Sequence, residues 1–532
     1  MTAASLCRLL VVAFAVTLST AAYADPVSLG IIGISGLFST AFSIGTAVAA
    51  AAFTPLGMAA LAVGASFAAS ALASKRGGRG FTQSNSSEVR YSTRQSAPAK
   101  RIVYGKAHCG GALFFERTSA PYLVQGFLIH AGEIESVDAI FIGTNRVSFA
   151  GGIVPGQILT PTSVEGQPDY AGHLRVSVRL GADDQTYDPL LRDRFGSEII
   201  PDAYRQRGIA TVVLEYRHPG NDFEEFQRLW GNGRQPSAYF LIKGKKVFDP
   251  RDPTQQRDVP STWRYSNNAT LCQTDYIRAD YGGRIAADRI DWEKVIEAAD
   301  YDDSPMGTLD DGFIRKHTCD GMFVLNQPPS DIMGDLLTAN RGSFVQEGGT
   351  VWPESSRPKR RVLTITDDML AGGIQYQPFK NRRELVNVVE PRFVAEEKLY
   401  EVVPGPEWRD EALISEHGEE HHAALSLPFT LDHRRCQRLA KLFGLEAQLE
   451  ASLGLQVDLV AMARATGPLT GGVVTLQSAL FPQANGDYEV KSVGFSEGFS
   501  ALELACVEYD GSIESAYDPA VDEQPFQPET EA

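Results

Sequence analysis

The stretch Arg101-Ile-Val-Tyr-Gly-Lys-Ala-His-Cys-Gly-Gly111 carries the most information about the fold of this chain. A run of β-prone residues leads into Tyr104-Gly105, and a glycine pair follows six residues after Tyr104. Further short β-type runs, bounded by Gly, Pro and Asn, continue as far as Val147. Runs of this length and composition predict strands that alternate with turns.

Strand-type sequence recurs through most of the remaining chain, with helices between. A strictly alternating strand at 174–180 lies within a polar, Gly- and Pro-rich excursion at 150–207. Asp291 is placed as the N-cap of an expected helix, and a proline begins the next one. The expected helices are 270–276, 291–299, 328–337 and 432–453, and the later strands are 457–460, 471–476, 488–493 and 501–507. We therefore expect an α+β fold dominated by β-strands.

The N-terminal sequence has a different character. Arg8 and the apolar run after it, up to a small-residue site ending at Ala24, form a pattern typical of a secretory signal. Two apolar stretches, 29–53 and 56–73, then follow without a charged residue, and each approaches the roughly 20 residues that span a bilayer. A basic segment begins at Lys75, and basic residues beside a membrane span usually stay on the cytoplasmic side. Taken alone, this start predicts export or membrane anchoring; alternatively, several copies bundle these segments inside a protein assembly.

The composition limits the classes of function. Forty-nine basic and 66 acidic residues give a net charge of −17. Phosphate binding requires clustered Lys and Arg, so we do not expect the chain to bind nucleic acid, although it can surround DNA. No cysteine pair has the close spacing of a zinc knuckle or a redox motif, so buried free thiols are expected. The six cysteines are Cys7, Cys109, Cys272, Cys319, Cys436 and Cys506.

His417-Gly-Glu-Glu-His421 is the most catalytic-looking cluster. It has the His-x-x-Glu-His order of one class of zinc peptidase, in which two histidines four residues apart on a helix hold the metal. The stretch 415–422 is very polar, contains Gly418 and has no apolar face to bury, so we favour a solvated loop.

Two further patterns are also interpreted as structural. Gly494-Phe-Ser-Glu-Gly498 matches a nucleophile elbow, which needs a strand before the serine and a helix after it. Strand-type sequence follows at 501–507, so a β-hairpin loop is expected. A group of aspartates lacks the regular oxygen spacing of a calcium loop, and we expect a solvated acidic loop. Its members are Asp300, Asp302, Asp303, Asp310 and Asp311.

The order of landmarks resembles the baseplate hub, or tip attachment, protein family of long-tailed (siphovirus-like) phages, whose type member is the phage lambda host-specificity protein J. The resemblance covers about residues 98–520. Besides 101–111 it rests on Gly208-Ile-Ala, Val247-Phe-Asp-Pro-Arg251, Asn267–Tyr276, Ile285–Asp291, Thr318–Phe323, Pro328–Ile332, Gly349–Trp352, Asn387-Val-Val, Leu427–Thr430 and Gln437–Ala440.

The resemblance implies a structural protein with no catalytic residue, cofactor or metal. Glycine permits turns and close backbone approach, so the family-motif positions would serve turn and packing geometry. These positions are Arg101, Tyr104, Gly105, Gly110, Gly111, Asp249, Pro250, Arg251, Asp331 and Arg438.

The resemblance also implies a homotrimer at the tip of a virion tail, assembled in the host cytoplasm. Three copies of two barrel-like units would give a pseudo-sixfold ring that joins a sixfold tail tube to a threefold tip, closes the channel and helps deliver DNA. The implied partners are the distal tail protein ring, the tape measure protein, other tail-tip proteins and a central fibre or receptor-binding protein. DNA would pass without specific binding. We expect residues 29–73 to pack in the lumen and later contact the host membrane.

The expected domains follow from composition at the two ends of the sequence and from the resemblance between them. They are an apolar helical head at 1–76, a linker at 77–98, a first β-barrel-like hub domain at 99–149 and 208–265, an inserted domain at 150–207, a mixed α/β hub domain at 266–385, a closing barrel-like domain at 386–510 with its long helix at 432–453, and a flexible acidic tail at 511–532. The chain is shorter than the type member, so another protein is expected to recognise the receptor. Two other functions stay open: an exported or membrane-anchored β-rich bacterial protein, and a zinc hydrolase built on His417 and His421.

Overall fold

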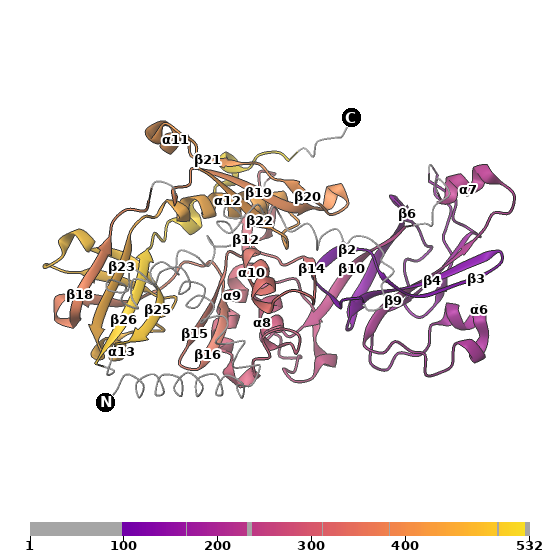
Figure 1. Cartoon of the computed structure of the whole chain (residues 1–532), viewed down its shortest axis with the longest axis horizontal. Coiled ribbons are helices and arrows are strands. Elements are labelled where there is room, and N and C mark those ends of the chain that lie inside the picture. The colour runs from indigo at the N-terminus through magenta and orange to yellow at the C-terminus, as the bar shows by residue number, and fades with distance from the viewer. Residues whose placement is uncertain are drawn as a thin grey trace, which may run out of the picture.

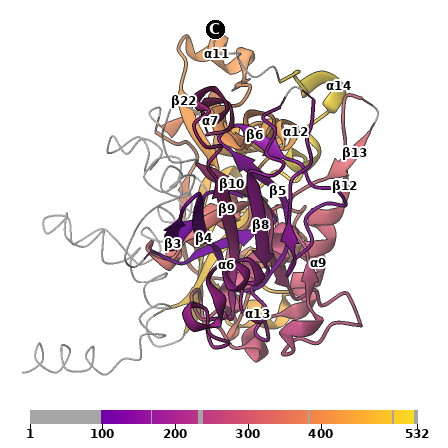
Figure 2. The same cartoon turned by 90° about the vertical axis from the view of Figure 1, so that its right-hand side faces the viewer.

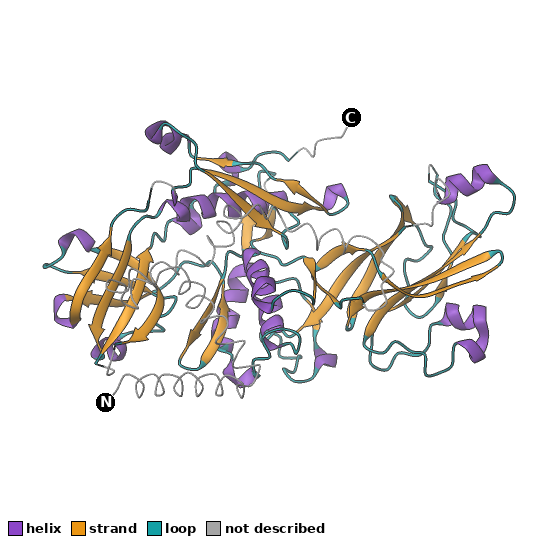
Figure 3. Ribbon diagram, in the orientation of Figure 1, coloured by secondary structure: helices purple, strands orange, loops and turns teal. Residues whose placement is uncertain are grey.

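The computed structural model describes residues 98–165, 167–230, 237–310, 312–381, 384–496 and 500–526. The expected head and nearly all of the expected linker lie outside these ranges. Within the ranges, no helix combines the length and apolar character needed to cross a bilayer. The chain there folds into an elongated α+β structure in which strands dominate (Figure 1 and Figure 3). The expected fold class is thus confirmed.

The first β unit, residues 106–265, forms the right-hand end of the molecule in Figure 1. One of its sheets has the strand order β3-β4-β9-β8-β7, and the other has the order β11-β10-β5-β6 with β2 also paired to β10. Its elements are β2 (Lys106–Cys109), β3 (Ala112–Ser119), β4 (Tyr122–Ala131), β5 (Ile134–Ile142), β6 (Asn145–Val147), β7 (Ile158–Leu159), β8 (Leu174–Arg179), α6 (Pro189–Ile199), β9 (Ile209–Arg217), α7 (Phe223–Trp230), β10 (Ala238–Val247) and β11 (Arg264–Tyr265).

One hydrophobic core joins the two sheets of the first β unit. Ile140 on β5 and Val212 on β9 are both fully buried in it. Buried side chains alternate with half-buried ones along most of β10, as period-two packing requires. The excursion at 150–207, expected to be an inserted domain, supplies β7 and β8 to the first sheet. Seen end-on in Figure 2, α6 lies against this sheet, on the side of β8 and β9.

The central unit, residues 266–356 together with β1, contains most of the helical structure of the middle of the molecule (Figure 1). Asn268 caps α8 and the expected N-cap, Asp291, accepts a hydrogen bond from Lys294 N, 3.1 Å away, at the start of α9. Both caps satisfy backbone donors that a helix start leaves free. The elements are β1 (Arg101–Tyr104), α8 (Ala269–Arg278), α9 (Trp292–Asp303), β12 (Pro305–Gly307), β13 (Phe313–Arg315), β14 (Gly321–Val324), α10 (Pro329–Thr338), β15 (Ser343–Glu347) and β16 (Thr350–Glu354).

Two further units complete the described chain. The six-stranded unit is a curved sheet of order β17-β24-β25-β26-β23-β18 at the left-hand end of Figure 1, and the four-stranded unit packs its sheet on helix α12. The six-stranded unit comprises β17 (Arg361–Thr366), β18 (Leu370–Gln377), β23 (Ser452–Asp458), α13 (Val460–Arg464), β24 (Val473–Gln477), β25 (Gly486–Phe495) and β26 (Ala501–Glu508). The four-stranded unit comprises β19 (Val388–Ala395), β20 (Glu401–Pro404), β21 (Trp408–Arg409), α11 (Glu411–His417), β22 (His422–Leu427) and α12 (His433–Gln448). The last elements of the described residues are η8 (Ile513–Ser515) and α14 (Pro519–Asp522).

The structure corrects the expected long helix. Helix α12 stops at Gln448, and Leu453, which the helical spacing placed on its apolar stripe, lies in β23. There Leu453 pairs with Cys506 and is fully buried, so strand pairing replaces helix packing. The expected flexible tail also packs against α12 as far as Phe526, whose ring lies 5.2 Å from that of Phe393.

The Arg101–Gly111 stretch lies where the first β unit meets the central unit. Strand β1 pairs with β14 of the central unit, whereas β2 pairs with β10 of the first β unit. Gly105 lies between β1 and β2 with φ of 59°. A Cβ atom there would collide with the Asp320 side chain and the Cys319 carbonyl. The switch between two sheets therefore requires glycine at this position.

We predict that Gly105→Ala destabilises the chain more than a matched glycine substitution. Gly143 has φ of 62°, but an added Cβ would meet nothing within 4 Å. Gly143→Ala therefore isolates the backbone strain, about 1–2 kcal/mol, whereas Gly105→Ala adds overpacking of about 1–3 kcal/mol. Urea unfolding of both variants measures the difference, and equal losses would contradict this account of the turn.

Candidate functional site

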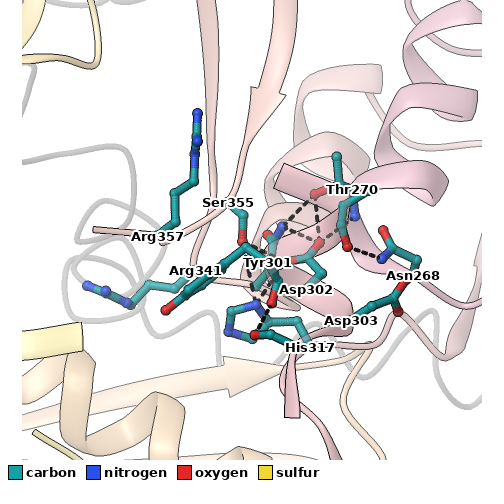
Figure 4. Close-up of polar contacts among 12 residues, drawn as sticks. Asn268, Thr270, Tyr301, Asp302, Asp303, His317, Arg341, Ser355 and Arg357 are labelled. Atoms are coloured by element: carbon teal, nitrogen blue, oxygen red, sulfur yellow. Dashed lines mark hydrogen bonds and ion pairs between the residues drawn. The ribbon is translucent and has the colours of Figure 1, made fainter. Parts of the chain in front are cut away.

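Asp302 lies at the centre of a fully buried polar cluster in the central unit (Figure 4). Its Oδ2 accepts hydrogen bonds from Thr270 N at 2.9 Å, from Thr270 Oγ1 at 2.6 Å and from Asn340 Nδ2 at 3.3 Å. Its Oδ1 accepts from Ser355 Oγ at 2.5 Å and contacts His317 Nδ1 at 2.9 Å. The expectation of a solvated acidic loop is wrong here, because Asp302 lies on α9 with 0% of its surface exposed.

His317 connects this carboxylate to the four-stranded unit. Its Nε2 lies 2.8 Å from Arg438 NH1, which can only donate, so Nε2 is the acceptor and Nδ1 carries the proton given to Asp302. Burial lowers the pKa of His317 to about 4, against the smaller opposing effect of Asp302. Burial likewise lowers the pKa of Arg438 to about 10. A neutral imidazole therefore bridges a buried carboxylate and a guanidinium.

Arg438, one of the family-motif positions, extends the cluster toward the other units. Its NH2 lies 3.5 Å from Glu514 Oε2 on η8. Arg341, next to Asn340 in the central unit, forms ion pairs with both Glu514 and Glu446 of α12. A chain of alternating charges thus ties the central unit, α12 and the C-terminal segment together. We call the cluster from Thr270 and Asp302 through His317 to Arg438, Glu514, Arg341 and Glu446 the Asp302 link.

The residue types of the Asp302 link include those of a hydrolase triad, but the geometry does not support catalysis. Ser355 Oγ donates its proton to Asp302, and His317 Nδ1 faces the same carboxylate. The histidine nitrogen that would have to accept a serine proton, Nε2, already accepts from Arg438. All of these side chains are buried, so the arrangement suits structural support.

A second buried cluster joins the first β unit to the central unit. The Tyr104 hydroxyl donates to Asp275 Oδ2 at 2.6 Å, and Lys245 Nζ contacts the same oxygen at 2.6 Å. Lys245 also donates to the Tyr281 hydroxyl at 3.1 Å. Burial first, and then the Asp275 carboxylate, raises the pKa of Tyr104. Tyr104 on β1, Lys245 on β10 and Asp275 on α8 therefore meet around one charge.

Most other family-motif positions lie in tight structural contacts. Arg101 NH1 donates to the Gly110 carbonyl at 2.6 Å, which ties the two ends of the motif together. A Cβ atom on Gly111 would collide with Phe127. Arg251, which follows Pro250, binds Asp249 within its turn and also reaches Asp300 and Asp303 on α9. Asp331 is exposed in the first turn of α10.

His417 and His421 do not form the site of a zinc peptidase. Helix α11 ends at His417, and Gly418 follows in the left-handed conformation as the C-cap, so the two histidines do not share a helix. Their rings are 5.9 Å apart. The expected loop at 415–422 is wrong for its first part, which is helical. Among the described residues, no group of three or more His, Cys, Asp and Glu is arranged to hold a metal.

The remaining sequence patterns have structural roles. Ser496 follows β25, its backbone N–H donates to the Ala501 carbonyl at 3.0 Å, and β26 follows. The expected hairpin is confirmed, since a nucleophile elbow would need a helix there. Five of the six cysteines lie in the described ranges, and all five are buried free thiols, as expected.

Sequence reasoning missed the central members of both clusters. Asp302 was grouped with its neighbours as a surface acid, and Ser355 and Lys245 belong to no recognised pattern. Asp275 lies within the landmark Asn267–Tyr276 but was not singled out there. Only Arg438 and Tyr104 were selected, through the family motif. A sequence signal for Asp302 exists in hindsight: it lies three residues after Ala299 and seven after Val295, both fully buried on α9.

We predict that Asp302→Ala is far more destabilising than Asp300→Ala, a matched change on the same helix. Loss of Asp302 leaves buried donors unpaired and should cost about 3–5 kcal/mol. The Asp300 side chain is 64% exposed and pairs with Arg251 at the surface, so its loss should cost within about 1 kcal/mol. Urea unfolding measures both, and similar losses would contradict the role assigned to Asp302.

We further predict a loss of stability on acidification that depends on His317. The folded pKa, about 4, lies below the unfolded value, so the unfolded chain binds more protons between about pH 6.5 and pH 4. The contribution of His317 is therefore complete above pH 6.5 and falls as the pH approaches 4. Between pH 7 and pH 5 it should decrease by about 2 kcal/mol.

Unfolding free energies at pH 7 and pH 5 test this for the unsubstituted chain and for His317→Gln. The variant should lose the His317 share of the pH dependence. His218→Gln is the control, because His218 lies at the surface. A variant with unchanged pH dependence would show that His317 is not the titrating group.

Comparison with known proteins gives a likeness in structure and none in sequence. No protein-family model matches the chain, and no curated protein matches it in sequence. A chain in the virion of a native gene transfer agent particle matches with a TM-score of 0.55 and 16% identity, covering 82% of this chain and 89% of that one.

Two tail proteins match more weakly. The 43 kDa tail protein of prophage MuSo2 from Shewanella oneidensis has 11% identity and a TM-score of 0.29, covering 78% of this chain and 100% of that one. A tail protein from Neisseria meningitidis MC58 has 9% identity and a TM-score of 0.27, covering 81% and 98%. Both scores are too low to establish a shared fold. The fold of this chain is accordingly that of a chain in the gene transfer agent virion.

Proposed function

We propose that this chain is a structural protein of a phage-like tail, and that it forms the central hub at the tail tip. The observation that carries the proposal is the shared fold with a virion chain, over 82% of this chain and 89% of that one. The sequence resemblance to the hub family, made independently of the fold, supports the finer assignment to the hub.

The buried joints between units support a mechanical role. The Asp302 link and the Tyr104–Asp275–Lys245 cluster both join units through charged groups that are largely buried. Burial keeps water from replacing the partner of such a group. A buried charge separated from its partner is strongly unfavourable, so the units resist independent movement. A part that transmits force between a tail tube and a tip needs such resistance.

The placement of the β-rich units supports the symmetry of the proposed hub. The first β unit and the six-stranded unit lie at opposite ends of the molecule, with the helices between them (Figure 1). Three copies would present six such units, which suits a sixfold tail tube above a threefold tip. In this proposal the distal tail ring and the tape measure protein are the neighbours of the hub, and residues 29–73 serve the channel and the host membrane.

We predict that the part of the chain after residue 80 forms a trimer. Native mass measurement of residues 81–532 at micromolar concentration should give three copies, because the exposed edges of the β units then find partners. The full chain measured in detergent should also give three copies. A monomer in both measurements would contradict the hub assignment, while the broader tail role would stand on the fold.

A further inference from the structure

A cavity of about 660 Å³ opens where the first β unit meets the central unit. Its size lies within the range of roughly 300–1,000 Å³ typical of small-molecule sites. It is lined by residues of β1 and β4, by the start of β9, by Leu325 just after β14 and by the segment after α8. The site does not overlap the Asp302 link.

The inner wall of the cavity is apolar. It is lined by Ile102, Ala112, Leu128, Ile129, Ile209 and Leu325. Ile102, Ala112 and Ile129 are buried in the fold, and the other three are half-buried. Such a wall favours an apolar molecule, because each methylene group removed from water contributes about 0.8 kcal/mol.

The rim has the opposite charge to the rest of the chain. Lys100, Arg207 and Arg284 line the cavity with exposed side chains, and Asp280 is the one acidic residue among the described residues that line it. The whole chain has a net charge of −17, so this is a local reversal of sign. Neither Lys100 nor Arg207 forms a side-chain ion pair with another described residue. Both are therefore available to an anion.

A buried acceptor also lines the cavity. His130 is only 2% exposed, and its Nδ1 lies 3.2 Å from the Gly132 carbonyl, which can only accept. Nδ1 therefore carries the proton, and Nε2 is an acceptor without a partner among the described residues. Burial lowers the pKa of His130 to about 4, so the ring is neutral. A bound molecule with an O–H or N–H group would complete this site.

We propose that this cavity binds a small anionic amphiphile, with a phosphate or carboxylate group at the Lys100–Arg207–Arg284 rim and an apolar body against the inner wall. An alkyl phosphate monoester combines the negative charge with an apolar body, and below its second pKa of about 6 it also carries a P–OH donor. Binding requires both parts: the head alone lacks the burial, and a neutral amphiphile leaves the rim unpaired.

The test is a calorimetric titration of the full chain with dodecyl phosphate below its micelle concentration. Lys100→Ala/Arg207→Ala should weaken binding about tenfold, as expected for two exposed ion pairs. The matched control is Arg146→Ala/Arg392→Ala, which removes two exposed strand arginines outside the cavity and should leave binding unchanged. Thermal unfolding of all variants checks that the fold is intact.

Three outcomes would overturn the proposal. If all variants bound dodecyl phosphate equally well, the amphiphile would be binding to another apolar part of the chain, such as 29–73. Equal binding of dodecyl maltoside would remove the anionic requirement, and equal binding of inorganic phosphate would remove the apolar one. If these results support the proposal, binding to phosphatidylglycerol vesicles then tests whether the natural ligand is a membrane lipid or a free molecule. Rim-dependent binding to the vesicles assigns a lipid headgroup, and its absence assigns a free molecule.

Discussion

The interior of the central unit is organised around the buried carboxylate of Asp302. Asp302 has no contact with solvent, and a charge in that position is tolerated only when several donors surround it. The donors come from Thr270, His317, Asn340 and Ser355, which span 86 residues of chain. All four segments must therefore be in place before the centre is stable. Arg438 is needed as well, because it donates a hydrogen bond to the buried Nε2 of His317.

The link differs from a simple salt bridge in the way it distributes charge. A neutral imidazole separates the carboxylate from the guanidinium, and Glu514 then stands between two arginines. Alternation of sign keeps each charge next to an opposite one, which limits the desolvation penalty of any single group. Hydrogen bonds in such a network polarise one another, so the units are coupled more strongly than separate pairs would couple them.

Local sequence patterns predicted the local structure well. Period-two alternation located β8, and the capping aspartate located the start of α9. These features depend on neighbours within a few residues, so a sequence displays them directly. The end of α12 did not follow the pattern, because its apolar spacing continues into Leu453. Pairing of Leu453 with Cys506, 53 residues away, decides that boundary, and no local pattern contains it.

The polar clusters show the same limit more sharply. Asp300, Asp302 and Asp303 are nearly equivalent in sequence, yet one is buried and two reach Arg251. Helical geometry fixes which aspartate points inward, and tertiary contacts alone decide that the inward position holds a charge. Tyr104 and Arg438 were found because a family motif marks them. Of their partners, Asp275 lies within the landmark Asn267–Tyr276 without being a selected position, and His317 lies just before the landmark Thr318–Phe323.

The change of sheet at Gly105 determines how force would travel through the molecule. A load arriving at residue 98 along the chain first meets the β1–β14 ladder, whose four residue pairs lie in the central unit. When a load runs along paired strands, their bonds resist it together, and none opens first. Strand β1 also contacts the first β unit directly, because Val103 is buried in the core of that unit, and beyond the turn β2 pairs with β10. A load that entered at residue 98 would therefore be shared at once between the central unit and the first β unit.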